Sequence, residues 1–307
     1  MNQYCLAVDI GATKAAIALV NQELKIIDRC EVSTGNNQNI WSEIEQATLS
    51  LIERNSAAIS EIGIGSAGPI NLKDGAISPV NISTWRAFPI VEKFSKLLNV
   101  KKVRLCGDAI ALALAESKIG AGKDVDSFLG MVVSTGVGGA LVLNRKIYHG
   151  SSGNAGYFGH HSISFALSGN ENKERCACGR TGCVELFASG PKMVEDAINS
   201  GWKNPRPNFE NLAADARAGD QNANKSIDKG AKALAVGIVN VLDILDINTV
   251  IIGGGVSKAG AIYWERLVAH VNQEAIFAEF LQQVDLRLSN LSSDAGLIGA
   301  AILAMED

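Results

Sequence analysis

Strand-like and helical patterns follow one another in a definite order in the first third of the chain, and this order restricts the fold more than any other feature. Three strand-like runs, Tyr4–Ile10, Ala15–Val20 and Lys25–Val32, are separated by short turns. A helical pattern over Ile40–Glu53 follows, and the apolar run that starts at Ile62 predicts a strand ending in a Gly/Pro turn. With the helical pattern that comes next, this β-β-β-α-β-α opening is typical of a mixed sheet flanked by helices.

The second part of the chain has a similar character. Phe128–Ser134 and Ala140–Leu143 are strand patterns on either side of a Gly-rich turn. Apolar residues recur at helical spacing across Ala223–Leu245, and a short strand pattern over Thr249–Ile252 follows. A helical pattern over Ala295–Met305 closes the chain. The two parts are loosely repeated α/β units, an arrangement that also fits an unrelated doubly wound enzyme.

The length of 307 residues exceeds that of a typical single domain, so we expect two α/β lobes. We place the smaller lobe at residues 1–117 plus 295–307 and the larger lobe at residues 118–294. Hydrophobic residues make up 47% and charged residues 20%, as in soluble globular proteins. The net charge of −4 and the scattered basic residues argue against nucleic acid as a partner.

The first residues enter a strand pattern directly, and no apolar run approaches the roughly 18 residues of a membrane helix. We therefore expect a cytoplasmic protein with no signal peptide and no membrane partner. Six cysteines in a chain of this length do not indicate a disulfide scaffold. Cys5, Cys30 and Cys106 lie in apolar stretches and are expected to be buried free thiols, whereas the other three crowd into Cys176–Cys183.

A tight turn between the first two strands carries the first candidate site. Asp9 ends the first strand, and Gly11, Thr13 and Lys14 follow it. Glycine and small residues let backbone N–H groups approach an anion, and Thr13 adds a hydroxyl. Asp9 could orient a metal-bound water. An ordinary hairpin turn explains the same residues.

Two further glycine-rich turns follow strands in the second part of the chain. The earlier of these two turns contains Thr135, Gly136 and Gly138, and the Thr135 hydroxyl corresponds to the Thr13 hydroxyl of the turn after Asp9. The second contains Gly254 and Gly255, where a nucleotide could pack against bare backbone. Each turn alone is weak evidence, but three phosphate-compatible turns in two α/β halves favour a nucleotide site.

The segment from Gly153 to Glu185 contains three cysteines within eight positions: Cys176, Cys178 and Cys183. Intervening glycines let the loop wrap, so three thiolates can converge on one tetrahedral ion, and one histidine would complete a Cys₃His structural zinc site. His160 and His161 are neighbours whose side chains face opposite ways in an extended chain, so only one of them can be the ligand.

The catalytic candidate is Asp108, which follows a strand and begins a helix. Phosphoryl transfer needs mainly positioning and charge stabilisation, but a carboxylate must still accept the proton of the attacking hydroxyl. An aspartate before Ala-Ile-Ala-Leu-Ala is otherwise a helix N-cap, which is the role that the residues alone favour, and both roles are compatible.

The three turns resemble the phosphate-1, phosphate-2 and adenosine elements of the actin/hexokinase superfamily. The chain as a whole resembles the ROK family of sugar kinases and sugar-responsive repressors. This resemblance rests on Asp9, Gly65–Pro69, Asp108, Ser134–Gly139 and the cysteine loop, on Asn81–Trp85, and on Gly253–Gly255 with Asp294–Ala301. It implies an actin/hexokinase-like (ribonuclease H-like) α/β fold of two lobes with an ATP cleft between them.

The resemblance also implies residue roles. Asp108 is the base, His160 binds zinc and touches the sugar, and Glu185 bonds a sugar hydroxyl. Gly68 and Asn81 belong to the implied sugar site. ATP and Mg²⁺ would bind with Thr13 and Thr135 beside the phosphates, structural Zn²⁺ would fill the cysteine loop, and the protein would be a homodimer.

The chain departs from the family pattern in four places, and the first two bear on the substrate. Gly107 replaces an asparagine that bonds the sugar, and Tyr157 replaces the glutamate of a Glu-x-Gly-His motif. Ala12 replaces a second turn glycine, and the insertion that contains Ser168–Asn172 is longer than usual. Loss of a buried polar recognition group weakens recognition of plain glucose.

The resemblance therefore implies ATP-dependent phosphorylation of a hexose or N-acetylhexosamine at the 6-hydroxyl. Tyr157 and the turn at Ser134 favour N-acetylmannosamine, whereas Asn81–Trp85 is closer to the glucokinase type of loop. The alternatives are a glucokinase and a sugar-binding protein without turnover, which Gly107 motivates. A transcriptional regulator is disfavoured because only eight residues precede Asp9, too few for a helix-turn-helix segment.

Overall fold

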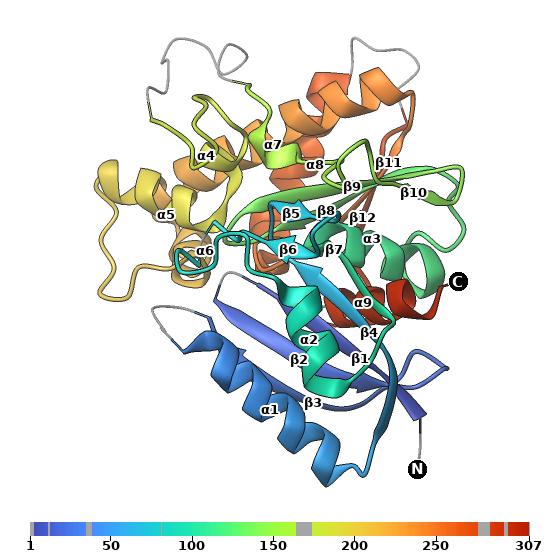
Figure 1. Cartoon of the computed structure of the whole chain (residues 1–307). Coiled ribbons are helices and arrows are strands. Elements are labelled where there is room, and N and C mark those ends of the chain that lie inside the picture. Colours follow the sequence, from blue (N-terminus) through green and yellow to red (C-terminus); the bar gives the residue numbers. More distant parts are fainter. Residues whose placement is uncertain are drawn as a thin grey trace. The chain divides into compact units, whose positions relative to one another are not determined.

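The structure, a computed structural model, describes residues 3–11, 13–34, 39–80, 82–163, 174–275, 283–291 and 294–306. The chain forms two compact units, drawn in Figure 1. Unit 1 comprises Met1–Asp124, Lys146–Ala155 and Asn290–Asp307, and unit 2 comprises Val125–Arg145 and Gly156–Ser289. Lys146–Ala155 thus belongs to unit 1, whereas the sequence predicted it as part of the larger lobe.

The sheet of unit 1 has five strands in the order β3-β2-β1-β4-β7. The strands are β1 (Gln3–Ile10), β2 (Lys14–Val20), β3 (Ile26–Ser33), β4 (Ala58–Ser66) and β7 (Val103–Gly107). β1, β2 and β3 pair in antiparallel fashion through their tight turns, while β4 and β7 join β1 in parallel. The mixed sheet expected from the opening pattern is thereby confirmed.

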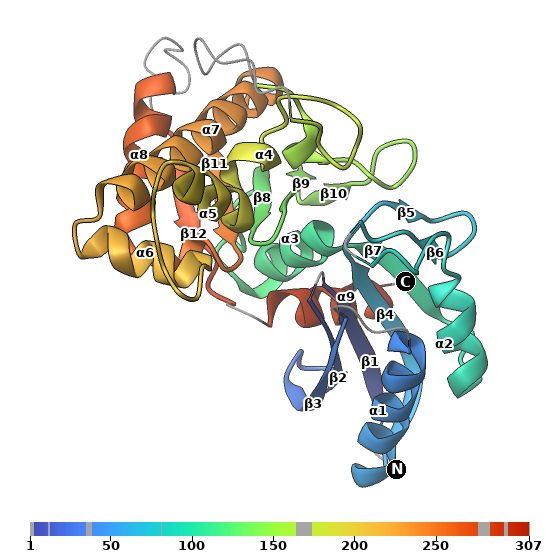
Figure 2. The same ribbon diagram turned by 90° about the vertical axis from the view of Figure 1, so that its left-hand side faces the viewer.

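The two faces of this sheet carry side chains of different size, because successive residues of a strand point to opposite faces. Leu6, Val8 and Ile10 share a core with α1 (Ile40–Arg54) and α2 (Ile90–Leu98). Cys5 and Ala7 share a second core with α9 (Ala295–Met305) on the other face. Figure 2 shows α9 beside the strands of this sheet. The small residues on this face let α9 come close to the sheet, and α3 (Asp108–Ile119) packs against α9 in turn.

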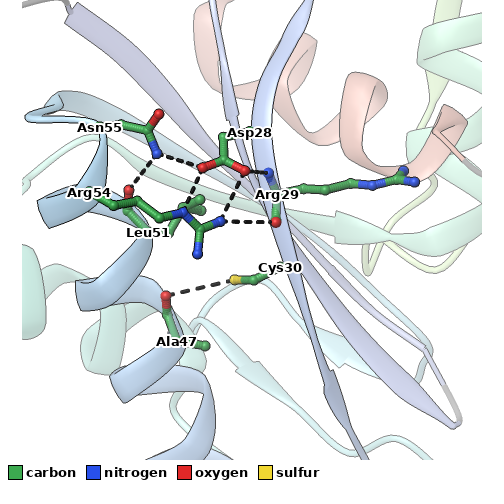
Figure 3. Close-up of polar contacts among 7 residues, drawn as sticks. All are labelled: Asp28, Arg29, Cys30, Ala47, Leu51, Arg54 and Asn55. Atoms are coloured by element: carbon green, nitrogen blue, oxygen red, sulfur yellow. Dashed lines mark hydrogen bonds and ion pairs between the residues drawn. The ribbon is translucent and has the colours of Figure 1, made fainter.

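Charged and polar side chains fix the end of α1 to strand β3 (Figure 3). Arg54 Nε lies 2.6 Å from Asp28 Oδ2, and the Asn55 amide donates to the same oxygen at 2.7 Å. Hydrogen bonds from Arg54 and Asn55 therefore lower the pKa of the Asp28 carboxyl well below its usual range. Arg29 directs its guanidinium away from this cluster, and Arg29 Nη1 lies 2.7 Å from Asp294 Oδ1.

Unit 2 contains a second sheet in which four strands lie in the order β9-β8-β11-β12. The strands are β8 (Phe128–Val133), β9 (Val137–Leu143), β11 (Thr249–Gly253) and β12 (Asp285–Leu288). β9 pairs antiparallel with β8, and β11 joins β8 in parallel. β12 was not expected from the sequence, because its short Asp-Leu-Arg-Leu segment carries too few apolar residues to show a clear strand pattern.

Helix α7 (Gln221–Leu245) runs through the core of unit 2 and packs against α8 (Ala261–Ala275). It begins two residues before the expected helical pattern, because the carboxylate of Asp220 accepts the Ala223 N–H and caps it. The remaining elements are short: β5 (Ile70–Asn71), β6 (Ala76–Ile77), β10 (Lys146–Tyr148), η1 (Phe158–His160), α4 (Glu185–Ala188), α5 (Gly190–Asn199), α6 (Phe209–Arg217) and η3 (Ser257–Ala259).

Among the described residues, no helix has both the length and the apolar character needed to cross a membrane.

The close packing of α9 predicts a specific sensitivity to substitution. A Cβ atom at Gly299 would lie 1.7 Å from the Ala111 carbonyl oxygen of α3, which is backbone and cannot yield. We expect Gly299→Ala to destabilise the protein by about 2 kcal/mol, although alanine alone would favour the helix by about 1 kcal/mol. Urea-induced unfolding measures this difference.

Gly230→Ala in α7 is the matched control. Its Cβ would meet the Sδ and Cγ atoms of Met193, at 2.3 and 2.7 Å, and the Phe187 carbonyl oxygen only at 3.1 Å, so most of the displacement falls on a flexible side chain. We expect a change of less than about 1 kcal/mol there. Equal destabilisation by the two substitutions would contradict the close-packing argument.

Candidate functional site

The turn between β1 and β2 is held by one hydrogen bond of its own backbone and by a second from the side chain of Thr34. The Gly11 N–H donates to the Lys14 carbonyl at 2.9 Å, and the Thr34 hydroxyl donates to the Gly11 carbonyl at 3.1 Å. Thr13 is exposed, and Ala12 lies outside the described residues. Lys14 Nζ lies 2.7 Å from Glu31 Oε1 on β3. This partner was not predicted from the sequence, although a prediction that β2 pairs with β3 would have placed Glu31 near Lys14.

Asp9 ends the strand that leads into this turn. It lies opposite Gly65 of β4 in the parallel register. Burial, and next the negative charge of Asp108, raise the pKa of the Asp9 carboxyl to about 7, while Lys14 acts in the opposite direction. The structure thus places Asp9 and Asp108 close enough to influence each other electrostatically within unit 1.

Asp108 is the first residue of α3, directly after β7. Its Oδ1 atom accepts the N–H of Ala109 at 2.8 Å. The N-cap itself is Gly107, so the expectation that Asp108 caps the helix is corrected by one position. Gly107 has φ −69° and ψ 152°, and a Cβ atom there would meet nothing within 4 Å. Neither backbone geometry nor packing therefore requires glycine beside Asp108.

The turn after β4 also approaches the end of β1. The Ala67 N–H donates to the Ile10 carbonyl at 2.9 Å, and the Gly68–Pro69 peptide bond that follows is cis. Gly68 is thus placed beyond the strand end that carries Asp9. Asn81, the other expected sugar contact of this unit, lies outside the described residues.

In unit 2, the two glycine-rich turns lie side by side. Gly254 has φ +100°, and a Cβ there would lie 2.3 Å from the Val133 carbonyl oxygen, so only glycine fits. A Cβ at Gly255 would lie 3.3 Å from Ser134 Oγ. Thr135 is exposed at the tip of its turn, and Gly138 pairs with Val132 just after it. The structure therefore brings together the turns expected to hold phosphate and adenosine.

Glu185, which begins α4, reaches the same turn. Its Oε2 atom accepts the N–H of Val137 at 2.9 Å, and a Cβ at Gly136 would lie 2.7 Å from that oxygen. The carboxylate expected to bond a sugar hydroxyl thus also holds the glycine-rich turn in place. The sequence shows no signal for this contact, because the two residues are 48 positions apart.

The four expected zinc ligands form one group. The ligand atoms of His160, Cys176, Cys178 and Cys183 all lie within 4.8 Å of one another. His160 Nδ1 lies 3.3 Å from Cys176 Sγ, and Cys178 Sγ lies 3.6 Å from Cys183 Sγ. Tetrahedral coordination with bonds of about 2.0–2.3 Å separates ligand atoms by roughly 3.5–3.8 Å, so these atoms fit one zinc ion.

The two neighbouring histidines, His160 and His161, lie in different surroundings. His161 Nδ1 lies 2.6 Å from the Phe158 carbonyl, and burial lowers the pKa of this imidazole. His160 instead faces the cysteines, as the family resemblance implied. The ring of Tyr157 lies over His160, with centroids 4.8 Å apart and planes inclined by 31°, and Tyr157 is 41% exposed.

Comparison with known proteins agrees with this arrangement. N-acetylmannosamine kinase from Haemophilus influenzae (strain PittEE) is 33% identical over 303 residues, which covers 97% of this chain and 94% of that protein. The ROK hexokinase from Thermus thermophilus superimposes with a TM-score of 0.80 at 29% identity, covering 97% of each chain. A ROK family glucokinase from Streptomyces griseus, solved with glucose and AMPPNP, gives 0.83 at 26% identity and covers 97% of this chain and 98% of that one.

These structural likenesses confirm the actin/hexokinase-like α/β fold class expected from the sequence. The ROK family pattern matches residues 5–307, which is nearly the whole sequence. The chain belongs to the ROK family.

Proposed function

We propose that this protein is a sugar kinase that transfers the γ-phosphoryl group of ATP to the 6-hydroxyl of N-acetylmannosamine. The observation that carries this proposal is the 33% identity to an N-acetylmannosamine kinase over 97% of the chain. The retained Asp9 and Asp108, the glycine-rich turns and the Cys₃His group support a working kinase rather than a sugar-binding remnant.

In this mechanism Asp108 accepts the proton of the sugar 6-hydroxyl as that oxygen attacks the γ-phosphate. Asp108 is the first residue of α3, and the Ala109 N–H donates to its Oδ1 atom, which helps to orient the carboxylate. A carboxylate poised in this way needs no covalent intermediate. The charge that develops on the phosphoryl group must be stabilised by other groups.

Those groups come from the turns. Backbone N–H groups and the exposed hydroxyls of Thr13 and Thr135 supply hydrogen bonds to phosphate oxygens, and Gly254 and Gly255 expose bare backbone to adenosine. Asp9, a carboxylate with a raised pKa beside a second carboxylate, fits a site that a divalent cation would neutralise. When bound with ATP, Mg²⁺ would shield the phosphate charges at that position.

Tyr157 is the residue we assign to sugar preference. Its exposed ring, supported by His160, offers an apolar face for an N-acetyl methyl group and a phenol for a hydrogen bond. The glutamate that commonly stands here would instead accept a hydrogen bond from a plain hydroxyl. Gly107 also disfavours plain glucose, because it removes a polar contact beside Asp108 although the backbone does not require glycine there.

Turnover on a panel of sugars tests the proposal. We expect kcat/KM for N-acetylmannosamine to exceed that for glucose by about 10-fold or more, the discrimination that one or two pocket contacts supply. Tyr157→Glu should narrow this ratio, whereas Tyr157→Phe, the matched control, should keep most of it if the ring face is what matters. Fast turnover of glucose with none of N-acetylmannosamine would make the protein a glucokinase.

The base assignment has its own test. Asp108→Asn preserves the shape of the side chain but cannot accept a proton, so we expect kcat to fall by about 10²–10⁴-fold. Sugar binding, followed by titration calorimetry, should change little. Retained turnover in this variant would show that another group takes the proton.

We propose further that His160, Cys176, Cys178 and Cys183 hold a structural zinc ion, which would fix the loop that carries His160 and leads into Glu185. Metal analysis should find about one zinc per chain in the wild type. Cys178→Ser should lose the zinc ion and, with it, thermal stability. Because Cys178 is exposed, a loss of core packing would not explain that result. Cys30→Ser, outside the group, is the control and should keep the metal; zinc retained by Cys178→Ser would contradict this set of ligands.

The family resemblance supports one further proposal, a homodimeric assembly. A cytoplasmic location remains the expectation drawn from the sequence. The lobe boundaries at residues 117/118 and 294/295 likewise remain a prediction.

A further inference from the structure

The carboxylate of Asp9 lies against a position where only glycine fits. Gly296 is the second residue of α9, and a Cβ atom there would lie 2.3 Å from Asp9 Oδ2 and 2.7 Å from its Cγ. Ordinary van der Waals contact begins near 3.4 Å. The carboxylate therefore occupies the volume that any other side chain at position 296 would need.

A second glycine lies beside the same carboxylate on the neighbouring strand. Gly65 of β4 pairs with Asp9, and a Cβ at Gly65 would lie 3.9 Å from Asp9 Oδ1 and 3.1 Å from the Cβ of Ala111 on α3. The Asp9 side chain thus lies beside two positions without side chains, one on β4 and one on α9. The missing side chain at Gly296 leaves the room that this carboxylate occupies.

Helix α9 cannot withdraw from this contact. Arg29 Nη1 bonds Asp294 Oδ1 at 2.7 Å just before the helix begins. One turn after Gly296, Gly299 lies against the Ala111 carbonyl of α3. On the sheet side, a Cβ at Gly63 would lie 1.7 Å from the Ala300 carbonyl oxygen. Figures 1 and 2 both show α9 running beside α3 and β4.

We propose that Gly296 is a positioning residue: the first turn of α9 sets the place of the Asp9 carboxylate relative to Asp108. The same helix touches Asp9 through Gly296 and, through Gly299, the helix that begins with Asp108. A cation held by Asp9 is thereby kept in register with the proton acceptor. The consequence for the reaction rests on the proposed kinase function; the contact itself does not.

A double-mutant cycle on thermal stability tests the contact without any assay of turnover. Gly296→Ala in the wild-type background should lower the melting temperature by about 5 °C, since overpacking costs of this kind shift a domain of this size by several degrees. In the Asp9→Ala background the obstructing carboxylate is gone, so the same substitution should cost nothing or raise the melting temperature. Equal losses in both backgrounds would overturn the proposal.

The cycle stays decisive if Gly296→Ala alone does not fold. The double variant Asp9→Ala/Gly296→Ala should then still fold, because the two atoms that collide are no longer both present. A double variant that also fails to fold would show that Gly296 is needed for another reason.

Kinetics then test the role in the reaction. Gly296→Ala should lower kcat by about 10-fold or more while the KM for sugar changes less than about 2-fold, because a misplacement near 1 Å is costly for a positioned group. Gly230→Ala, remote from Asp9, should keep wild-type kinetics. An unchanged kcat in Gly296→Ala would refute the positioning role. If the wild type phosphorylates no sugar, the kinase proposal fails, while the stability cycle still decides the contact.

Discussion

The close approach of α9 to the sheet of unit 1 is the constraint on which the rest of that unit depends. The sheet face beneath α9 carries Cys5, Ala7, Ala16 and Ala18, whereas the opposite face carries leucine, valine and isoleucine. Small side chains let the backbone of α9 approach the backbone of the strands, and a glycine at the contact, which has no Cβ, lets the two backbones come closer still. A core of this kind gains little from side-chain burial but defines position sharply, because backbone atoms cannot change rotamer.

This constraint explains why the C-terminal segment belongs to unit 1 although the chain has passed through all of unit 2 before it. Without α9, one face of the first sheet would be exposed, and Gly296 would no longer lie against the end of β1. The polar contacts on the other side of the sheet, such as Asp28 with Arg54, fix helix ends and lie near solvent, so they contribute less. Backbone packing, rather than charge, sets the geometry around Asp9.

Much of this architecture could be predicted from the sequence, because it depends on local periodicity. The strand-like runs of the first three strands, the apolar spacing of α7 and the glycine-rich turns are all readable within short windows. The cysteine spacing likewise predicted the group that the structure assembles around His160. The pairings of Lys14 with Glu31, Glu185 with Val137 and Asp9 with Gly296 could not be predicted, because each joins elements whose register only the fold determines.

The departures from the family pattern differ in kind from the glycines that shape the site. Gly254 is required by its positive φ and Gly296 by the carboxylate against it, so neither can change without moving its neighbours. Gly107 has ordinary backbone angles and open space, and Tyr157 is exposed on its own turn. Substitution at these two positions leaves the frame that carries Asp9 and Asp108 intact. Under the proposed function, sugar preference would therefore vary independently of phosphoryl transfer, since the first is assigned to replaceable side chains and the second to residues fixed by backbone contacts.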